Sequence, residues 1–294
     1  MKPILLCMKK TIEIIIVNYN SILWLQKILD SLYSFFVPYS KYKITITVVD
    51  NASTDNSIEI LEKNYKQINL IKSEKNLGFS RGNNLALRKS SADYIMLLNS
   101  DTEFTSKAKT LDTLFYMLEI DNGIGIITPK LVLSNGKIDK ACHRSEPSLF
   151  DCALYFAGFE KLFPKVPFFT KYHLLNKDLQ TIHQVDAVSG ACMITKLEYL
   201  KKVDFFDERF FMYSEDMDLC RKIRELGLKI VYNPTIEIIH HKYKSGLKSN
   251  DIKTKKKISK YFYNSFLIYY DKWYRNRWYY KILRPFILLF VKTI

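Results

Sequence analysis

The sequence predicts an α/β protein in which a mainly parallel sheet is covered by helices on both faces, followed by a basic helical tail. Three observations lead to this class. Short apolar runs alternate with segments whose apolar residues recur every three or four positions. A polar cluster follows most of these runs. The chain has 294 residues, 48% hydrophobic and 26% charged, which suits one large domain with a sizeable core and excludes a small disulfide-stabilised module.

The first two strands are expected at residues 12–17 and 44–49, which are nearly continuous apolar runs. The first run ends in the turn-forming residues 18–21, and the second leads into the polar stretch 50–57. The helix after the first strand places apolar residues on one face, at Leu25, Ile28, Leu29, Leu32 and Phe36. This order of elements predicts a βαβ unit.

A third short strand is expected at residues 69–71, and a loop containing glycine then leads to a helix from about Gly82 to Lys89. The fourth strand, residues 94–98, ends at Asn99-Ser100-Asp101. Polar clusters therefore lie just past the carboxyl ends of strands. In open α/β sheets this edge binds ligands, because the loops converge there and helix amino termini point N–H groups at phosphates.

Each cluster also has a purely structural interpretation. Asn and Asp side chains in residues 50–57 can cap turns and helices without binding anything. The two glycines and the arginine of residues 76–84 are weak evidence for a phosphate-bearing ligand when taken alone. Asp101 at a strand end can bind a divalent cation that bridges a pyrophosphate, or simply cap a turn.

The most specific signal is the stretch 205–221, in which a string of aromatic residues precedes several carboxylates at the start of an apolar-striped helix. Carboxylates there complement the helix dipole, for about 0.3–1 kcal/mol each. That effect leaves the aromatic string unexplained. An aspartate at a helix amino terminus can take a proton from a sugar hydroxyl as its oxygen attacks, so Asp216 is predicted to be a general base.

Six motifs in order resemble family 2 glycosyltransferases, most closely the bacterial rhamnosyltransferase-like branch. They are VVDNASTDNS from Val48, NLGFSRGNN from Asn76, LLNSDTE from Leu97, VSGACM from Val188, FFDERFFMYSEDMDLCRKIRELG from Phe205, and a proline followed six residues later by a histidine, Pro234 to His240. The resemblance covers about residues 12–241. It implies the GT-A fold, a mixed, mainly parallel nucleotide-binding sheet flanked by helices.

The resemblance also implies roles for individual residues. The nucleotide-sugar would be bound by Asn18, Asp50, Asn51, Asp55, Gly78, Arg81, Gly82 and Asn99, with Asp50 at the pyrimidine and Arg81 near the diphosphate or ribose. A divalent cation, Mg²⁺ or Mn²⁺, would be held by Asp101 and His240. Asp216 would be the catalytic base, and Glu215 beside it would position the acceptor.

Two departures from the family pattern stand out. Asn99 and Ser100 precede Asp101 where the strict metal motif begins with another aspartate, so Asp101 and His240 would need phosphate oxygens and water to complete the site. Asp204-Phe205-Phe206-Asp207 replaces the more usual Gly-Gly-Phe-Asp, so the loop over the donor is expected to sit differently.

The charge divides the chain into two parts. The formal charge is +15, but residues 1–241 carry 31 basic and 28 acidic side chains, against 14 and 2 in residues 242–294. We therefore expect a catalytic domain at 11–241, with a nucleotide-sugar half at 11–128 and an acceptor-binding and catalytic half at 129–241. Residues 242–294 would form a basic, aromatic-rich helical tail. Attachment to an anionic membrane surface is the favoured interpretation, over packing on the domain or binding nucleic acid.

The expected function is inverting, metal-dependent transfer of a sugar, with dTDP-rhamnose favoured, to a saccharide or polyprenyl-linked acceptor in cell-envelope polysaccharide synthesis. A UDP-hexose donor is the alternative, and a basic nucleotide- or nucleic-acid-binding protein without catalysis is a third possibility. Five scattered cysteines, an amino terminus too short for a signal peptide and the lack of a 20-residue apolar window favour a cytoplasmic enzyme on the inner face of the membrane.

Overall fold

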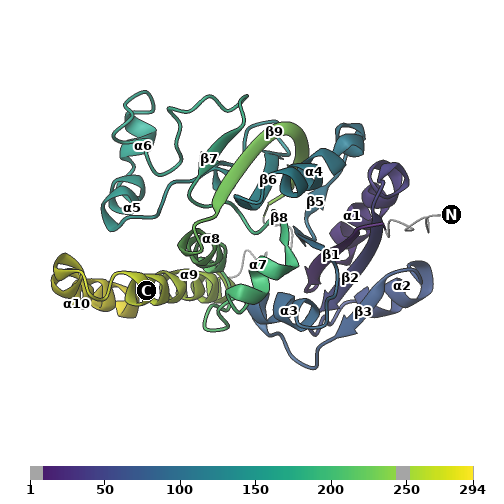
Figure 1. Cartoon of the computed structure of the whole chain (residues 1–294). Coiled ribbons are helices and arrows are strands. Elements are labelled where there is room, and N and C mark those ends of the chain that lie inside the picture. Colours follow the sequence, from purple (N-terminus) through teal and green to yellow (C-terminus); the bar gives the residue numbers. More distant parts are fainter. Residues whose placement is uncertain (1–8, 243–251, 294) are drawn as a thin grey trace.

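The computed structural model describes residues 9–242 and 252–293 and contains one mixed β-sheet with helices on both faces (Figure 1). Residues 1–8, judged above too short for a signal peptide, and residues 243–251 of the tail lie outside the described part. The side chains of the basic residues Lys253 and Lys255 also lie outside it. The predicted fold class, an α/β sheet with a helical tail, is confirmed.

The four predicted strands of the first half are present, as β1 (Thr11–Asn18), β2 (Lys43–Asp50), β3 (Asn69–Lys72) and β4 (Tyr94–Asn99). They alternate with α1 (Ile22–Phe35), α2 (Ser57–Asn64) and α3 (Gly78–Leu87). β1 pairs in parallel with both β2 and β4, and β2 pairs in parallel with β3. The register sets Asn18 opposite Asp50 and Val17 opposite Asn99, so the polar residues after these strands meet at one edge.

The predicted start of the third helix at about Gly82 is wrong, because α3 begins at Gly78. Two distant groups hold its first residues in place. The Leu77 backbone N–H donates to Asn51 Oδ1 at 2.9 Å, and the Phe79 N–H donates to the Phe211 carbonyl at 2.7 Å. These partners are not visible in the local sequence, which is why the boundary is misplaced.

The second half makes the sheet mixed. Its strands are β5 (Thr102–Glu103), β6 (Ile124–Leu133), β7 (His183–Val185), β8 (Cys192–Lys196) and β9 (Lys229–His240). β8 runs antiparallel between β4 and β6, while β9 runs parallel to β6 and carries β5 and β7 as antiparallel partners. Because two antiparallel pairings separate β4 from β9, the carboxyl end of β9 returns to the edge where β4 ends.

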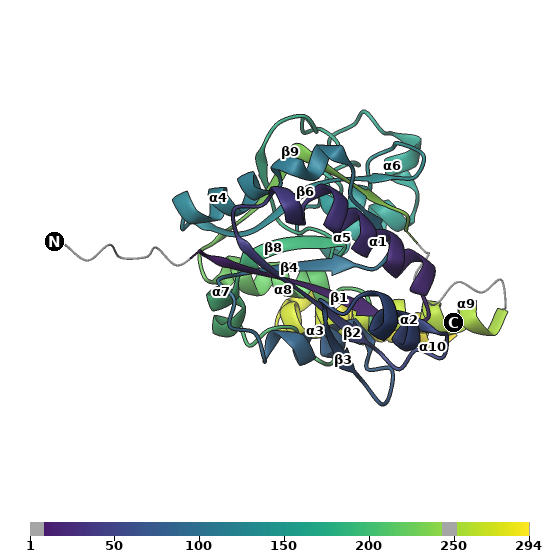
Figure 2. The ribbon, with the colours of Figure 1, turned by 90° about the vertical axis from the view of Figure 1, so that its right-hand side faces the viewer.

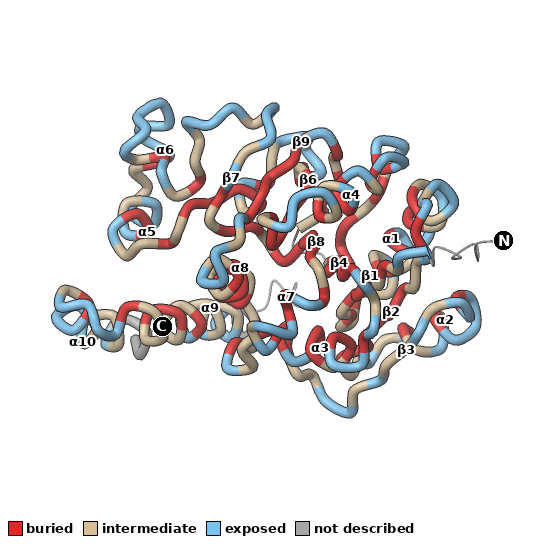
Figure 3. The backbone as a smooth tube through the Cα atoms, in the orientation of Figure 1, coloured by how far each residue is buried: buried red, intermediate tan, exposed pale blue. Residues whose placement is uncertain are grey.

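The helices form layers on the two faces of this sheet. The second half contributes α4 (Asp112–Ile120), α5 (Leu149–Phe156), α6 (Phe159–Leu162), α7 (Leu197–Lys202) and α8 (Glu215–Glu225), with short 3₁₀ helices at Val37–Tyr39, Ser106–Thr110 and Lys140–Cys142. α1 and α4 lie on one face, and α3 and α7 on the other (Figure 2). Figure 3 shows buried positions concentrated in the strands, α3 and α8. A Cβ on Gly125 would lie 2.3 Å from Ile223, so α8 packs directly on β6.

The tail forms α9 (Ile252–Trp273) and α10 (Trp278–Thr293). α9 packs on the body: Tyr269 and Tyr270 are fully buried, and Lys272 pairs with Asp218 of α8 at 2.7 Å. Glu146 accepts hydrogen bonds from the hydroxyl groups of Tyr269 and Tyr274 at 2.8 and 3.1 Å. α9 therefore folds back on the domain, one of the three arrangements considered for the tail. Among the described helices, none is both long and apolar enough to cross a bilayer.

Candidate active site

A buried polar cluster joins the ends of β1 and β2. The Asn18 amide nitrogen donates to Asp50 Oδ2 at 3.0 Å and to Ser57 Oγ at 3.0 Å. Asp50 also accepts the Ser53 N–H at 2.9 Å, and Asp55 accepts the Ile22 N–H at 3.3 Å. Asn18 and Asp50 are fully buried. These bonds organise the predicted nucleoside pocket, because they hold the carboxylates and amide of two adjacent strand ends in one arrangement.

Asn51 connects this cluster to the start of α3. Its amide nitrogen donates to the Gly78 carbonyl at 3.0 Å. Gly78 has φ +79°, and a Cβ there would lie 2.2 Å from the Phe211 carbonyl oxygen; a Cβ on Gly82 would lie 3.0 Å from the Val17 side chain. The close approaches that require both glycines are therefore made by the chain itself, and contact of either glycine with a nucleotide stays a prediction.

Arg81 lies half-exposed on α3, and the ion pair described for it joins its Nε to Glu208 at 3.5 Å. Its predicted place beside the diphosphate thus depends on the resemblance alone. Asn99 lies at the carboxyl end of β4, at the edge where the polar clusters meet. Its N–H donates to the Ala191 carbonyl at 3.0 Å.

Asp101 and His240, the predicted metal ligands, are brought together although 139 positions separate them in the chain. The pairing of β5 with β9 places Thr102 opposite His240. His240 Nε2 lies 3.4 Å from Asp101 Oδ1, and both residues are buried. On the other side of the ring, Nδ1 lies 2.8 Å from Asp139 Oδ2, and Lys242 donates to Asp139 Oδ1 at 3.0 Å.

This arrangement fits a divalent cation. A metal-binding histidine usually donates its second ring nitrogen to a carboxylate, as Nδ1 of His240 does to Asp139, and this leaves Nε2 toward Asp101. Burial lowers the pKa of His240, but the carboxylates of Asp101 and Asp139 outweigh burial and raise it to about 8. In the described part of the chain, no three His, Cys, Asp or Glu side chains gather as a metal site, so phosphate oxygens and water would have to complete the coordination.

His241 has a different environment, although it is adjacent. Its Nε2 lies 2.6 Å from Glu103 Oε2, its Nδ1 lies 2.9 Å from Ser134 Oγ, and its ring packs on Trp24. Both ring nitrogens are thus engaged away from Asp101. The geometry favours His240 over His241, as the motif spacing does.

Asp216 lies in the first turn of α8, and its carboxylate is oriented by two groups from other segments. Arg144 Nη2 donates to Asp216 Oδ2 at 2.6 Å and to the Val188 carbonyl at 2.8 Å. The Gly190 N–H also reaches Oδ2, at 3.4 Å. The two carboxylate oxygens provide about four lone pairs, so Asp216 keeps acceptor capacity for a substrate hydroxyl.

Glu215 is buried, and its Oε2 has no hydrogen-bond partner within the described residues. Burial, helped by the neighbouring Asp216 charge, raises the pKa of Glu215 from an ordinary 4.5 to about 8. At neutral pH it is therefore mostly protonated, which suits a hydrogen-bond donor to an acceptor sugar better than a second base.

Hydrogen bonds connect the regions of the three key carboxylates along one edge of the sheet. Asn18, which binds Asp50, also accepts from Ser21 Oγ at 2.7 Å, and Ser21 contacts Ser100 at 3.1 Å, next to Asp101. From the other side, loop 189–191 joins the backbone of Asn99 to the side chain of Asp216. These hydrogen bonds place Asp50, Asp101 and Asp216 along one edge of the sheet.

Sequence reasoning missed Arg144 and Asp139, which orient the candidate base and the candidate metal ligand. Both lie within residues 129–186, where the sequence has no readable motif. Their only signal is tertiary: Arg144 exchanges backbone hydrogen bonds with Ala187, and Asp139 reaches β9 through a turn after β6. Nothing in the local sequence around this arginine and this aspartate indicates which residues they contact.

The loop before α8 departs from the family pattern in residue type, and its backbone has a conformation that favours glycine at two positions. Asp204 and Phe205 have φ values of 51° and 54°. The left-handed region costs ordinary residues roughly 1–2 kcal/mol each. Asp204 and Phe205, at the positions where the family motif more usually has two glycines, therefore adopt a backbone region that suits glycine. That this loop sits differently over the donor stays a prediction.

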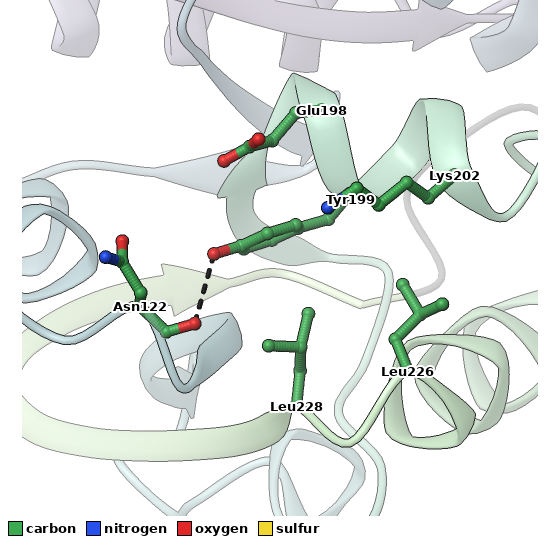
Figure 4. A pocket seen from close by; sticks show the side chains of 6 residues that line it. All are labelled: Asn122, Glu198, Tyr199, Lys202, Leu226 and Leu228. Carbon is green, nitrogen blue, oxygen red and sulfur yellow. Dashed lines mark hydrogen bonds between the residues drawn. The ribbon is translucent and has the colours of Figure 1, made fainter.

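A pocket of about 450 Å³ lies at the other edge of the sheet, between α7 and the turns before β6 and β9 (Figure 4). It is lined by Asn122, Glu198, Tyr199, Lys202, Leu226 and Leu228. The Tyr199 hydroxyl donates to the Asn122 carbonyl at 3.1 Å across it. None of the predicted site residues lines this pocket, so it is separate from the candidate active site.

Comparisons with known proteins show the family to which the chain belongs. Residues 13–187 match the family described as glycosyl transferase family 2. The N-acetylglucosaminyl-diphospho-decaprenol L-rhamnosyltransferase of Mycobacterium tuberculosis is 25% identical over 210 residues, which cover 68% of this chain and 67% of that protein. The rhamnosyltransferase WbbL of Escherichia coli K12 is 27% identical over 176 residues, covering 56% and 61%.

The fold is also that of solved GT-A enzymes. The crystal structure of GalNAc-T7 with UDP, GalNAc and Mn²⁺ superposes with a TM-score of 0.58 at 14% identity. The match covers 84% of this chain but only 47% of GalNAc-T7, so this chain spans about half of that structure. From the family match and the rhamnosyltransferase relatives together, the chain belongs to glycosyl transferase family 2 and is similar to the rhamnosyltransferases within it.

Proposed function

We propose that this glycosyltransferase moves a sugar from a nucleotide-sugar, dTDP-rhamnose being favoured, to a saccharide or polyprenyl-linked acceptor, with inversion at the anomeric carbon. The observation that carries the proposal is the position of Asp216. It lies at a helix amino terminus, oriented by Arg144 and connected to the strand ends of the nucleotide half. The rhamnosyl donor and polyprenyl acceptor are supported by the name of the mycobacterial relative.

The reaction needs one proton transfer and one displacement. The acceptor hydroxyl oxygen forms a bond to C1 of the sugar while the bond from C1 to the diphosphate oxygen breaks, and its electron pair leaves with the diphosphate. Asp216 takes the acceptor proton on the opposite side of the ring from the leaving group, which inverts C1. Protonated Glu215 donates a hydrogen bond that positions the acceptor.

The leaving diphosphate needs stabilisation of its negative charge. Asp101 and His240 would hold Mg²⁺ or Mn²⁺, which when bound neutralises the departing phosphate oxygens. Asp139 keeps the His240 ring oriented for this task. Arg81 is assigned to the same phosphates, because the family motif contains it.

We assign residues 11–241 to the catalytic domain, with the nucleotide half at 11–128 and the acceptor half at 129–241. The product would be cell-envelope polysaccharide, made at the cytoplasmic face of the membrane. Residues 242–294 would attach the enzyme there. This is supported by their composition, since they contain 14 basic residues and only 2 acidic ones. A UDP-hexose donor is the second candidate, supported by the UDP-bound structure of the same fold.

Replacing Asp216 tests the proposal. Asp216→Asn keeps the size of the side chain and is expected to lower turnover at least about 100-fold. Because it leaves the Arg144 guanidinium without its charged partner, the variant is also expected to be less stable, and thermal unfolding must show that it is folded under the assay conditions. Transfer is measured in single turnovers with a panel of dTDP- and UDP-sugars, and the anomeric configuration of the product is read by NMR. Near-normal turnover of the variant would remove Asp216 from the role.

A matched control is Asp207→Asn. Asp207 belongs to the same motif, but its carboxylate bonds to Arg209 at 2.7 Å and Lys272 at 2.9 Å, whereas Asp216 bonds to Arg144. The control is expected to lose some stability but retain turnover. If no sugar of the panel is transferred or hydrolysed by the unmodified enzyme, while nucleotide still binds, the non-catalytic alternative is favoured.

A further inference from the structure

The segment that contains α5 and α6 exposes an unusual amount of apolar surface. Its exposed large side chains include Phe150, Phe156, Leu162, Phe163, Val166 and Phe168, which together are called the α5–α6 surface. Leu162 is 69% exposed and Phe168 is 58% exposed. The aromatic members are neighbours: the Phe150 ring contacts the Phe168 ring, with centroids 5.7 Å apart, and both Phe163 and Phe168 contact Phe169. Scattered single exposed apolar residues need no explanation, but a contiguous group of this kind marks an interaction site.

The charges around the α5–α6 surface have one sign. Within residues 149–171 the exposed charged side chains are Lys161, Lys165 and Lys171. The two acids of the segment are buried: Asp151 lies 3.5 Å from Lys171, and Glu160 pairs with Lys140 at 2.7 Å. An outside partner therefore meets aromatic and aliphatic groups set among ammonium groups, the chemistry of the headgroup layer of an anionic bilayer.

The α5–α6 surface continues into the tail. The Phe156 ring contacts Phe262 of α9 edge-on, with the centroids 5.9 Å apart. Beyond α9, α10 exposes Trp278, Ile282, Phe286 and Leu289 at helical spacing, and Lys281 is exposed between them. α5, α6 and α10 all lie on the left-hand side of the molecule in Figure 1, and α6 and α10 both lie toward the right in Figure 2.

We propose that the α5–α6 surface is a second contact with an anionic lipid bilayer, which acts with α10 to set the orientation of the enzyme on the membrane. The inference depends on the membrane attachment proposed above and extends it to the acceptor half. One amphipathic helix leaves the domain free to rotate about it, whereas two separated contacts define a plane. Two weak contacts also bind much more tightly together than either does alone.

Two double variants of the full chain test this. Leu162→Asp with Phe168→Asp alters the α5–α6 surface, and Ile282→Asp with Phe286→Asp alters α10. Ile120→Asp is the matched control, because Ile120 is 65% exposed at the end of α4, away from both surfaces. Binding is measured by flotation with vesicles containing equal amounts of phosphatidylcholine and phosphatidylglycerol. Each double variant is expected to bind at least about tenfold more weakly, and the control as the unmodified chain.

A charge reversal, Lys161→Glu with Lys165→Glu, keeps the apolar groups and is expected to weaken binding and its dependence on salt. Thermal unfolding checks that all variants are folded. Unchanged binding of both the Leu162/Phe168 and the Lys161/Lys165 variants would overturn the proposal while leaving attachment through α10 intact. The proposal would also be overturned if sedimentation showed that the Leu162/Phe168 variant is a monomer where the unmodified chain is a dimer, while its affinity for vesicles is unchanged. Donor hydrolysis without lipid, measured in parallel, reports separately on the proposed enzyme function.

Discussion

The interaction between Arg144 and Asp216 joins residues 72 positions apart at the centre of the candidate site. Their side chains are 9% and 14% exposed, so the guanidinium and the carboxylate are each largely removed from water. Removing one partner of a buried ion pair leaves an uncompensated charge, which costs more than the pair itself contributes. The pair therefore stabilises the fold and also orients the carboxylate of the candidate base.

Arg144→Gln is expected to lower the free energy of unfolding by about 3 kcal/mol or more, the usual cost of breaking a buried pair. Asp216→Asn in the same chain should restore part of this loss, because the unpaired charge is then gone. Urea unfolding of the two single variants and the double variant measures the coupling. Arg88→Gln, which breaks an exposed pair with Glu208, should cost no more than about 1 kcal/mol. Strictly additive losses at positions 144 and 216 would contradict the pairing.

Glu215 predicts a pH dependence of stability. Its pKa is raised on folding from 4.5 to about 8, so the folded chain binds a proton that the unfolded chain releases between these values. Stability from this group is complete below about pH 4.5 and is lost as the pH rises toward 8. In Glu215→Gln that loss is absent. The stability of the variant relative to the unmodified chain should thus rise by up to about 1.4 kcal/mol per pH unit.

Chemical unfolding at several pH values between about 5 and 8 measures this difference. Glu225→Gln, at an exposed position of the same helix, is the control and should show no such trend. A constant difference between Glu215→Gln and the unmodified chain across this range would show that Glu215 is not protonated in the folded state.

At the scale of elements, α9 packs on the outer side of α8, the helix that carries the candidate base. Asp218 of α8 is buried, and it accepts from Lys272 Nζ and from Trp273 Nε1, each at 2.8 Å. The Arg221 guanidinium stacks 4.5 Å from the centre of the Trp273 ring. Because Asp218 lies within one turn of Asp216 on α8, docking of the tail and the position of the candidate base are physically connected.

Trp273→Phe removes the indole donor to Asp218 but keeps an aromatic ring against Arg221. We expect a loss of about 2 kcal/mol in the free energy of unfolding, since hydrogen bonds to buried charged groups contribute about 1.5–3 kcal/mol. Trp278→Phe on α10 is the control, because Trp278 is 74% exposed and should change stability by less than about 0.5 kcal/mol. Both are measured without lipid. Equal effects would mean that the Trp273 bond does not hold α9 on α8.

At the scale of the whole molecule, the candidate metal site joins a strand from the middle of the chain to the last strand of the sheet. Ligands that bind only the folded state raise its stability, so Mn²⁺ and dTDP together should raise the melting temperature more than either does alone. His240→Ala should abolish most of the rise in melting temperature that depends on Mn²⁺. His241→Ala should keep this rise, since His241 bonds to Glu103 and Ser134.

Differential scanning fluorimetry over a Mn²⁺ titration measures this without relying on activity. His240→Asn serves as a second variant, because its amide can still donate to Asp139 and so protect folding. A larger loss of Mn²⁺ response at His241 than at His240 would reverse the assignment of the metal ligand.

The sequence by itself determined the fold class, the four parallel strands and the edge at which polar residues gather. Apolar periodicity and turn residues are local properties, and the parallel βαβ order then requires the ends of β1, β2 and β4 to meet. Motif resemblance added Asp50, Asp101, Asp216 and His240. Hydrogen bonds among the strand ends and loops place the three aspartates along one edge of the sheet, with His240 beside Asp101.

Only the tertiary structure decided how these residues are held. Arg144 and Asp139 lie in a segment without motifs, and the start of α3 depends on groups supplied by Asn51 and Phe211. The two glycines of the α3 motif are explained by contact with the chain itself, and the tail divides into a docked α9 and an exposed α10. Each of these features arises between residues far apart in the sequence, where local pattern carries no information about which partner will be adjacent.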